Sequence, residues 1–290
     1  MYIYDEEKEL FTFDGDFDEF LIELGVSKDH INRMKDKKLY NDKLEYYDDY
    51  EENQYETLVP LERVIWTSRA NYGWSVYENV RKMHIGDREP TRFQMCFSHK
   101  KDKNFQEYCE SFEKDIKPVN LVHFVEDDEY CVSSDGNHRT LTAMLIGAKN
   151  IKAKVYDCHI DYVKKDRYEI SKTFYQKYGI EKIVEQYGNI SYTIYFQDEK
   201  GVFTVTGYPE YYVSSSLEDY LAELGNIIEN DFKKANFIKK LPGFMQNIIL
   251  LFMNNRRIKQ IVNKRYYNKE QTNFRSIIRT VHLYDDRYIE

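Results

Sequence analysis

The stretch DGNHR, residues 135–139, places chemistry-bearing side chains between a β-rich run and a short helical pattern. Asp-Gly is a turn pair, and glycine tolerates a positive φ angle and lets another group approach the backbone closely. A helix that starts directly afterwards leaves the amides from Asn137 to Thr140 without intrahelical partners, and its dipole favours negative charge there. The junction is therefore shaped for an anion such as phosphate.

The side chains of this junction suit the same ligand. Arg139 supplies a planar fork of donors that can bind two phosphate oxygens at once, and His138 can donate a further hydrogen bond. Asp135 could orient His138 or Arg139, or hold a magnesium ion that bridges phosphates, because hard cations prefer carboxylate oxygens. The structural alternative is an ordinary Asp-Gly turn with an aspartate capping the helix. The residues alone leave both interpretations open.

The flanking elements should place the junction between a strand and a helix. Residues 116–134 contain two β-rich runs joined by acidic residues, which is the pattern of a hairpin. Residues 140–147 then give a helical face that ends at Gly147, where a C-cap is expected, and residues 151–157 alternate like a strand. The predicted order is strand, turn, helix, strand.

The N-terminal part contains two further helical patterns. Residues 17–25 have apolar side chains at helical spacing with Gly25 as a stop, and residues 27–38 form a second helix capped by Ser27. Residues 40–56 are acidic and rich in tyrosine without a clear period, which indicates a solvated connector, with a docking segment as the alternative.

Beyond residue 160 the pattern changes. Residues 161–188 are typical of a helix, residues 190–208 predict a hairpin around the turn DEKG, and residues 217–267 predict two long amphipathic helices. The apolar run IILLFM at 248–253 is far shorter than the roughly 20 residues of a membrane span. We therefore expect it to be a buried helix and expect no membrane partner.

Composition and charge limit the class of protein. Hydrophobic residues make up 42% and aromatic residues 16%, so the chain is expected to fold, and its net charge is −8. Residues 1–60 carry 18 acidic against 7 basic side chains, whereas residues 231–290 carry 5 against 13. The basic residues of 256–265, beside Tyr266 and Tyr267, could contact DNA or RNA, and a solvated helix face explains them equally well.

Two features favour a cytoplasmic location. The N-terminal residues 1–10 are acidic where a signal peptide needs a basic segment, and the four cysteines show no CxxC spacing.

The segment DGNHRTLTAMLIGAKNIKAKV resembles the phosphate loop and following helix and strand of the ParB/sulfiredoxin-like superfamily. The upstream segments VIWTSR, NYGWSVYENVRK and IKPVNLVHFV occur in the order found in that superfamily, so the similarity covers roughly residues 58–157. Where sulfiredoxin has a nucleophilic cysteine in this loop, Asn137 stands here, and sulfinic acid reduction is not expected. The motif ENVR at 78–81 precedes the loop, unlike the corresponding motif of partitioning proteins.

The resemblance implies an α+β fold and a set of site residues. It implies that His138 and Arg139 contact nucleotide phosphates, that Gly136 and Asn137 belong to the same loop, and that Arg69 faces the site. Thr140 joins the expected binding residues through its backbone amide at the helix start. Glu62 stands near the position of a catalytic carboxylate in some members that are small-molecule kinases.

We therefore expect three segments: an acidic N-terminal extension (1–57), a ParB/sulfiredoxin-like mixed-sheet domain with helices (58–160), and a mainly helical C-terminal module containing a β-hairpin (161–290). The expected function is binding of a nucleotide such as ATP or CTP with Mg²⁺, for phosphoryl transfer or nucleotide hydrolysis. In that function Asp135, His138, Arg139 and Glu62 are the candidate catalytic residues. The alternative is a nucleic-acid-binding or nuclease-like protein of mobile-element or defence type. The oligomeric state is left open.

Overall fold

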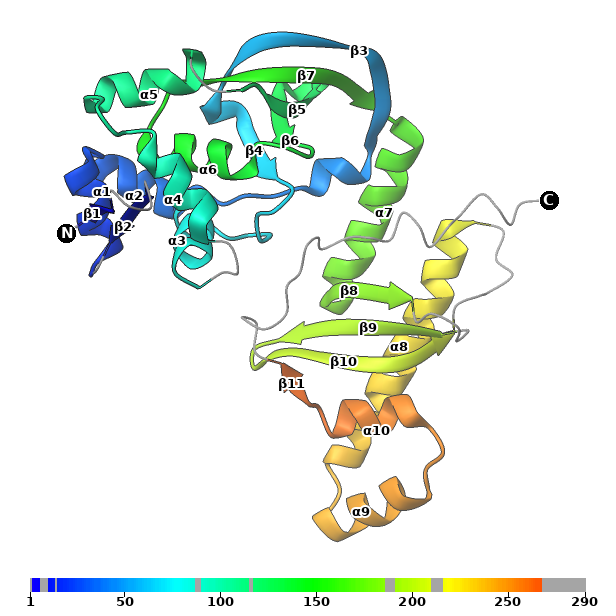
Figure 1. Cartoon of the computed structure of the whole chain (residues 1–290). Helices are drawn as coiled ribbons and strands as arrows, with labels where there is room; N and C mark the ends of the chain where they lie inside the picture. The colour runs from blue at the N-terminus through cyan, green and yellow to red at the C-terminus, as the bar shows by residue number, and fades with distance from the viewer. Residues whose placement is uncertain are drawn as a thin grey trace. The chain divides into compact units, whose positions relative to one another are not determined.

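The computed structural model divides the chain into two compact units, Met1–Ile160 and Asp161–Glu290, both of which combine helices and strands (Figure 1). It describes residues 2–5, 10–13, 15–86, 90–114, 117–185, 191–209 and 216–267. The long strand β3 (Tyr47–Pro60) runs across position 57/58, where the sequence pattern placed the start of the central domain.

The first unit is built on a five-stranded mixed sheet with the order β3-β7-β5-β6-β4. β4 and β6 are parallel, as are β5 and β7, whereas the pairs β5–β6 and β3–β7 are antiparallel. The strands other than β3 are β4 (Val64–Thr67), β5 (Val119–Phe124), β6 (Glu129–Val132) and β7 (Asn150–Ile160). A separate hairpin joins β1 (Tyr2–Asp5) to β2 (Leu10–Phe13).

The expected order of strand, turn, helix and strand around the junction is confirmed. β5 and β6 form the hairpin, α6 (Asn137–Ile146) follows the junction, and β7 returns to the sheet beside β5. Eight of the ten residues of α6 are buried, so this helix lies in the middle of the first unit's core. Gly147 ends it in the left-handed conformation, with φ of 86°.

Helices surround α6 on the same side of the sheet (Figure 1). The two predicted N-terminal helices form as expected: Gly25 ends the first with φ of 119°, and the Ser27 hydroxyl caps the second by accepting from the His30 amide. The helices are α1 (Phe17–Leu24), α2 (Lys28–Asp36), α3 (Val76–Gly86), α4 (Pro90–Ser98) and α5 (Phe105–Lys114), with 3₁₀ turns η1 (Asp42–Glu45), η2 (Leu61–Arg63) and η3 (Val125–Asp127).

The acidic segment 40–56 is not a solvated connector, because most of it forms the edge strand β3 paired with β7. Its first residue, Tyr47, is buried and donates a hydrogen bond to the Asp127 carboxylate at 3.0 Å. The next nine residues are exposed, so neither face of this part of the strand needs apolar side chains and no alternation marks it in the sequence. Charged residues on an exposed edge also oppose pairing with other chains.

The second unit contains an antiparallel sheet with the order β11-β10-β9-β8. The predicted hairpin around DEKG is present as β9 (Ser191–Asp198) and β10 (Gly201–Pro209). The predicted helix over 161–188 is shorter than expected: α7 (Tyr162–Tyr178) ends at Gly179, whose φ is 61°, and the chain continues as β8 (Ile180–Glu185). The last strand, β11 (Tyr266–Tyr267), is short.

The C-terminal helices of this unit are α8 (Leu217–Lys239), α9 (Gly243–Phe252) and α10 (Arg256–Val262). α8 packs on the sheet through Phe232, whose ring centroid lies 5.3 Å from that of Phe196. The second of the two predicted long helices is interrupted at residues 253–255, where Asn255 caps α10 through the amide of Ile258.

The expectation of a buried helix over the apolar run was wrong. None of the ten residues of α9, all of which are described, is buried. The helix stands away from β8, β9 and β10 within its unit (Figure 1). Among the described helices, none combines the length and the apolar character that crossing a bilayer requires.

Candidate functional site

The DGNHR junction and the two serines before it, together residues 133–139, lie where two parallel strands end side by side. From here on, the junction means these seven residues. β4 and β6 are neighbours, and their last residues, Thr67 and Val132, are partners in the strand register. Ser68 and Arg69 follow β4, and the junction follows β6, so both loops meet at one edge of the sheet. The carboxyl ends of parallel strands are a common place for ligand sites.

Asn137 joins these two loops. Its Oδ1 accepts hydrogen bonds from the Ser68 hydroxyl at 3.0 Å and from the Arg69 amide at 3.2 Å, and its Nδ2 donates to the Ser134 carbonyl at 3.0 Å. The residue is 4% exposed. The backbone of Arg69 thus lies next to the junction, and the side-chain amide of Asn137 holds the two loops together.

Gly136 lets the junction pack closely against β5. Its φ is 104°, and a Cβ atom at this position would lie 2.4 Å from Cβ and Cγ1 of Val119. Close by, the Asn120 amide donates to the Asp135 carbonyl at 3.1 Å. A side chain other than hydrogen therefore does not fit here, which accounts for glycine at this position.

The first turn of α6 is only partly as expected. The Thr140 amide donates to the Gly136 carbonyl at 2.8 Å, so it belongs to the helix and is not offered to a ligand. No side-chain hydrogen bond caps the helix at Gly136. The amides of residues 137–139 are therefore the ones that an anion at this helix end would meet.

Arg139 is bound by the protein itself. Its Nη2 lies 2.9 Å from Oδ2 of Asp135, and its Nη1 donates to the carbonyl of Lys117. The Arg139 side chain is 17% exposed, whereas that of Asp135 is 57% exposed. An incoming anion would therefore take the place of the Asp135 carboxylate beside a guanidinium that the Lys117 carbonyl already orients.

His138 and a second histidine lie on the α4 side of the junction. The His138 ring packs edge-on against Phe93, with ring centroids 4.6 Å apart, and the residue is half-buried. Burial lowers the pKa of His99, and the positive charges of Lys103 and Arg139 lower it further. The positive charge of Arg139 therefore also acts on His99, the residue directly after α4.

The junction has too few carboxylate ligands to bind a metal ion without ligands from another molecule. Asp135 is its single carboxylate. The described ranges hold no cluster of three or more His, Cys, Asp or Glu side chains suited to a metal ion. Asp135 can at most add one oxygen to an ion that arrives with phosphates, since magnesium often needs only one or two protein carboxylates in such complexes.

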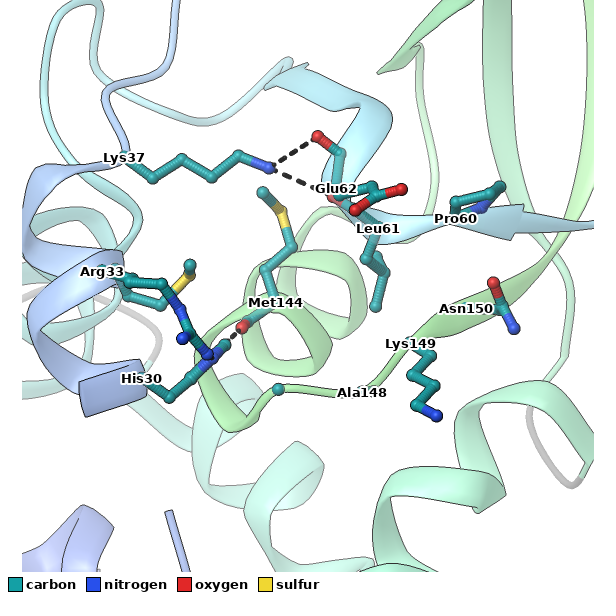
Figure 2. Close-up of a pocket in the computed structure, with 12 residues that line it drawn as sticks. His30, Arg33, Lys37, Pro60, Leu61, Glu62, Met144, Ala148, Lys149 and Asn150 are labelled. Atoms are coloured by element: carbon teal, nitrogen blue, oxygen red, sulfur yellow. Dashed lines mark hydrogen bonds between the residues drawn. The ribbon is translucent and has the colours of Figure 1, made fainter. Parts of the chain in front are cut away.

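Glu62 is not part of the junction. It lies in η2 and lines a cavity of about 830 Å³ at the opposite, C-terminal end of α6 (Figure 2). A ten-residue helix is about 15 Å long, so the two ends of α6 are separate places. The cavity is lined by His30, Arg33, Met34, Lys37, Pro60, Leu61, Glu62, Met144, Gly147, Ala148, Lys149 and Asn150.

Internal hydrogen bonds engage several polar groups of this cavity (Figure 2). Lys37 donates to the carbonyls of Leu61 and Glu62, and burial lowers its pKa. His30 lies with Nε2 2.9 Å from the Met144 carbonyl and Nδ1 3.2 Å from Nη2 of Arg33, which fits a neutral ring whose proton is on Nε2. Burial lowers the pKa of His30, in agreement with a neutral ring.

Sequence reasoning did not find this cavity. Its lining comes from three separate short segments, 30–37, 60–62 and 144–150, and no motif joins them. Glu62 was singled out for another role, and no signal in the chain marks its neighbours.

Comparisons with known proteins add no relative. No family model matches the chain, and neither the curated proteins nor the solved structures contain a match.

Proposed function

We propose that the junction 133–139 binds a phosphate group of a nucleotide of the ATP or CTP type. The observation that carries the proposal is the helix start at Gly136, which has no side-chain cap and lies at the edge where β4 and β6 end. First-turn amides and the helix dipole together favour an anion there. Arg69 is next to the loop in the chain fold, because its backbone amide donates a hydrogen bond to Asn137, and its side chain is exposed, so it is the second cation of the proposal.

The ion pair between Arg139 and Asp135 defines how binding would proceed. The Asp135 carboxylate is more than half exposed and can move into water, whereas Arg139 is held by the Lys117 carbonyl. A phosphate group can then replace the carboxylate and accept two hydrogen bonds from the guanidinium. A released Asp135 is the carboxylate available to an accompanying magnesium ion.

The family and the type of reaction are part of the same proposal. The hairpin, glycine turn, buried helix and parallel return strand are consistent with a ParB/sulfiredoxin-like domain. Phosphoryl transfer or nucleotide hydrolysis would rest on Arg139 and His138 stabilising charge on the transferred group. Glu62 has no part in this step, because it lies at the other end of α6.

Isothermal titration calorimetry with ATP, CTP and inorganic phosphate, with and without magnesium, tests the proposal. Arg69→Ala and Arg139→Ala should each weaken nucleotide binding at least tenfold, since hydrogen bonds to charged groups contribute about 1.5–3 kcal/mol each. Lys149→Ala, which removes a cation at the cavity end of α6, is the matched control and should bind as the wild type does.

Two results would contradict the proposal. One is a wild-type protein that binds none of these ligands at millimolar concentration. The other is binding that Lys149→Ala weakens and the two arginine variants leave unchanged.

A further inference from the structure

α9 exposes a face of large apolar side chains that the phosphate-binding proposal does not explain. Phe244, Ile248, Leu251 and Phe252 occupy helical positions i, i+4, i+7 and i+8, which places them on one face. Their exposed fractions are 68%, 53%, 75% and 78%. The half-buried residues Ile249 and Leu250 lie on the remaining sides. The apolar side of this helix thus faces outward, which is the reverse of a helix that packs on a core.

Met245, the residue after Phe244, is a further exposed apolar residue of α9, with 39% of its surface exposed. We call the surface made by Met245 and the four residues above the α9 face. Large apolar groups gathered in this way on one surface mark an interaction site.

The chain segment that contains α9 carries charges of one sign. Residues 232–267 contain nine lysine and arginine side chains and no aspartate or glutamate. Lys233, Lys234, Lys239, Lys240 and Arg256 are exposed. Two other cations of the set are already used within the unit, because Arg257 pairs with Asp231 at 2.6 Å and Lys264 pairs with Asp198 at 2.6 Å.

We propose that the α9 face docks on the surface of an anionic lipid bilayer, with its apolar side chains among the upper acyl chains and its lysines at the headgroups. A short apolar helix face bordered by basic residues is the arrangement of helices that lie in the membrane interface. The ten residues of α9 are too few to cross the membrane, so the binding is to one surface. This proposal replaces the expectation of no membrane partner, which rested on the length of the apolar run and excludes only a span.

An anionic bilayer suits the α9 face better than a second copy of the chain or a nucleic acid. A second copy of the chain would bring an equally basic border against the first, and like charges repel. Nucleic acid would satisfy the lysines, and bases can stack on Phe252, but it would leave Leu251 and Ile248 in water, because neither phosphates nor base stacking suits aliphatic side chains. An anionic bilayer satisfies both kinds of side chain at once.

Co-sedimentation of the full chain with vesicles tests the proposal. We expect binding to vesicles of phosphatidylcholine containing about a third phosphatidylserine, and at least tenfold weaker binding to phosphatidylcholine alone or in high salt. The variant Leu251→Ser/Phe252→Ser should lose roughly a hundredfold in partitioning. Lys239→Gln/Lys240→Gln should lose about thirtyfold.

The matched control is Tyr162→Ser/Val163→Ser, which removes two apolar side chains of similar exposure, 66% and 61%, from α7 in the same unit. It should bind vesicles as the wild type does. The altered positions of all three variants are exposed, and far-UV circular dichroism should show unchanged folding.

Three outcomes overturn the proposal. The first is wild-type protein that stays in the supernatant with phosphatidylserine vesicles at low salt. The second is a dimer, seen by analytical ultracentrifugation without lipid, that Leu251→Ser/Phe252→Ser dissociates. The third is salt-sensitive binding of an oligonucleotide that exceeds binding to the vesicles and that Lys239→Gln/Lys240→Gln abolishes.

Discussion

Replacing Gly136 by alanine tests the close packing that places the phosphate-binding junction. The backbone at Gly136 has φ of 104°, a region that costs a residue with a side chain about 1–2 kcal/mol. The new methyl group would also lie 2.4 Å from Cβ and Cγ1 of Val119 and 3.2 Å from its Cα. Val119 is fully buried and its backbone belongs to β5, so this clash adds about 1–3 kcal/mol of overpacking. We expect Gly136→Ala to lower the free energy of unfolding by about 2–5 kcal/mol.

Urea unfolding followed by tryptophan fluorescence measures this change in the first unit alone. The chain contains two tryptophans, Trp66 and Trp74, and both belong to residues 1–160. The matched control is Gly73→Ala: its φ is 72°, and its Cβ would meet only Tyr40 Cε1 at 3.9 Å. The control therefore carries the backbone cost without the clash, about 1–2 kcal/mol. Equal destabilisation by the two variants would refute the close approach to Val119.

Three further predictions concern other contacts. Asn137→Ala should destabilise the first unit by about 1–3 kcal/mol in the same fluorescence assay, because the Arg69 amide and the Ser134 carbonyl lose their buried partner; a neutral result would contradict the bridging role. Arg257→Ala should destabilise the second unit by about 3–5 kcal/mol in urea unfolding followed by circular dichroism, since it leaves the buried Asp231 carboxylate unpaired. Lys177→Ala breaks an exposed pair with Glu229, and this control should change stability by less than about 1 kcal/mol; equal effects of the two variants would refute the distinction. Hydrogen bonds with Glu126 and Glu51 raise the pKa of His159, so its stabilisation is complete below the ordinary pKa of 6.5 and is lost as pH rises through the raised pKa. The urea midpoint of wild type minus that of His159→Gln should therefore be larger at pH 6 than at pH 8.5, and a pH-independent difference would count against this pairing.

Local sequence signals predicted the elements that depend on neighbours in the chain. Gly25 and Gly147 end their helices with positive φ, and Ser27 caps α2, because each acts within one turn of its own position. The β5–β6 hairpin was predicted for the same reason, since its strands are separated by one short acidic turn.

Elements that depend on distant partners were not predicted. β3 is a strand because β7 pairs with it, although its exposed acidic side chains show no alternation. β8 continues a helical pattern in the sequence, but Gly179 turns the chain and the strand pairs with β9. The apolar run in α9 was expected to be buried in the protein core. Hydrophobicity indicates that these side chains favour an apolar environment, but it does not tell whether that environment is the core of the chain or something outside it.

The candidate site shows the same division. The turn at Gly136 and the helix start were visible in the motif. The engagement of Arg139 by Asp135 and by the Lys117 carbonyl was not, because Lys117 is brought there by β5. The separation of Glu62 from the junction likewise follows from the path of the sheet.

The amide chemical shifts of residues 136–140 during a titration with ATP provide the most direct test of the phosphate-binding proposal. We predict that the amides of Asn137, His138 and Arg139 shift together, in a saturable way, with the dissociation constant that calorimetry gives for the same protein. Shifts confined to His30, Lys149 and other residues of the cavity at the far end of α6, or no saturable shift at all, would contradict it.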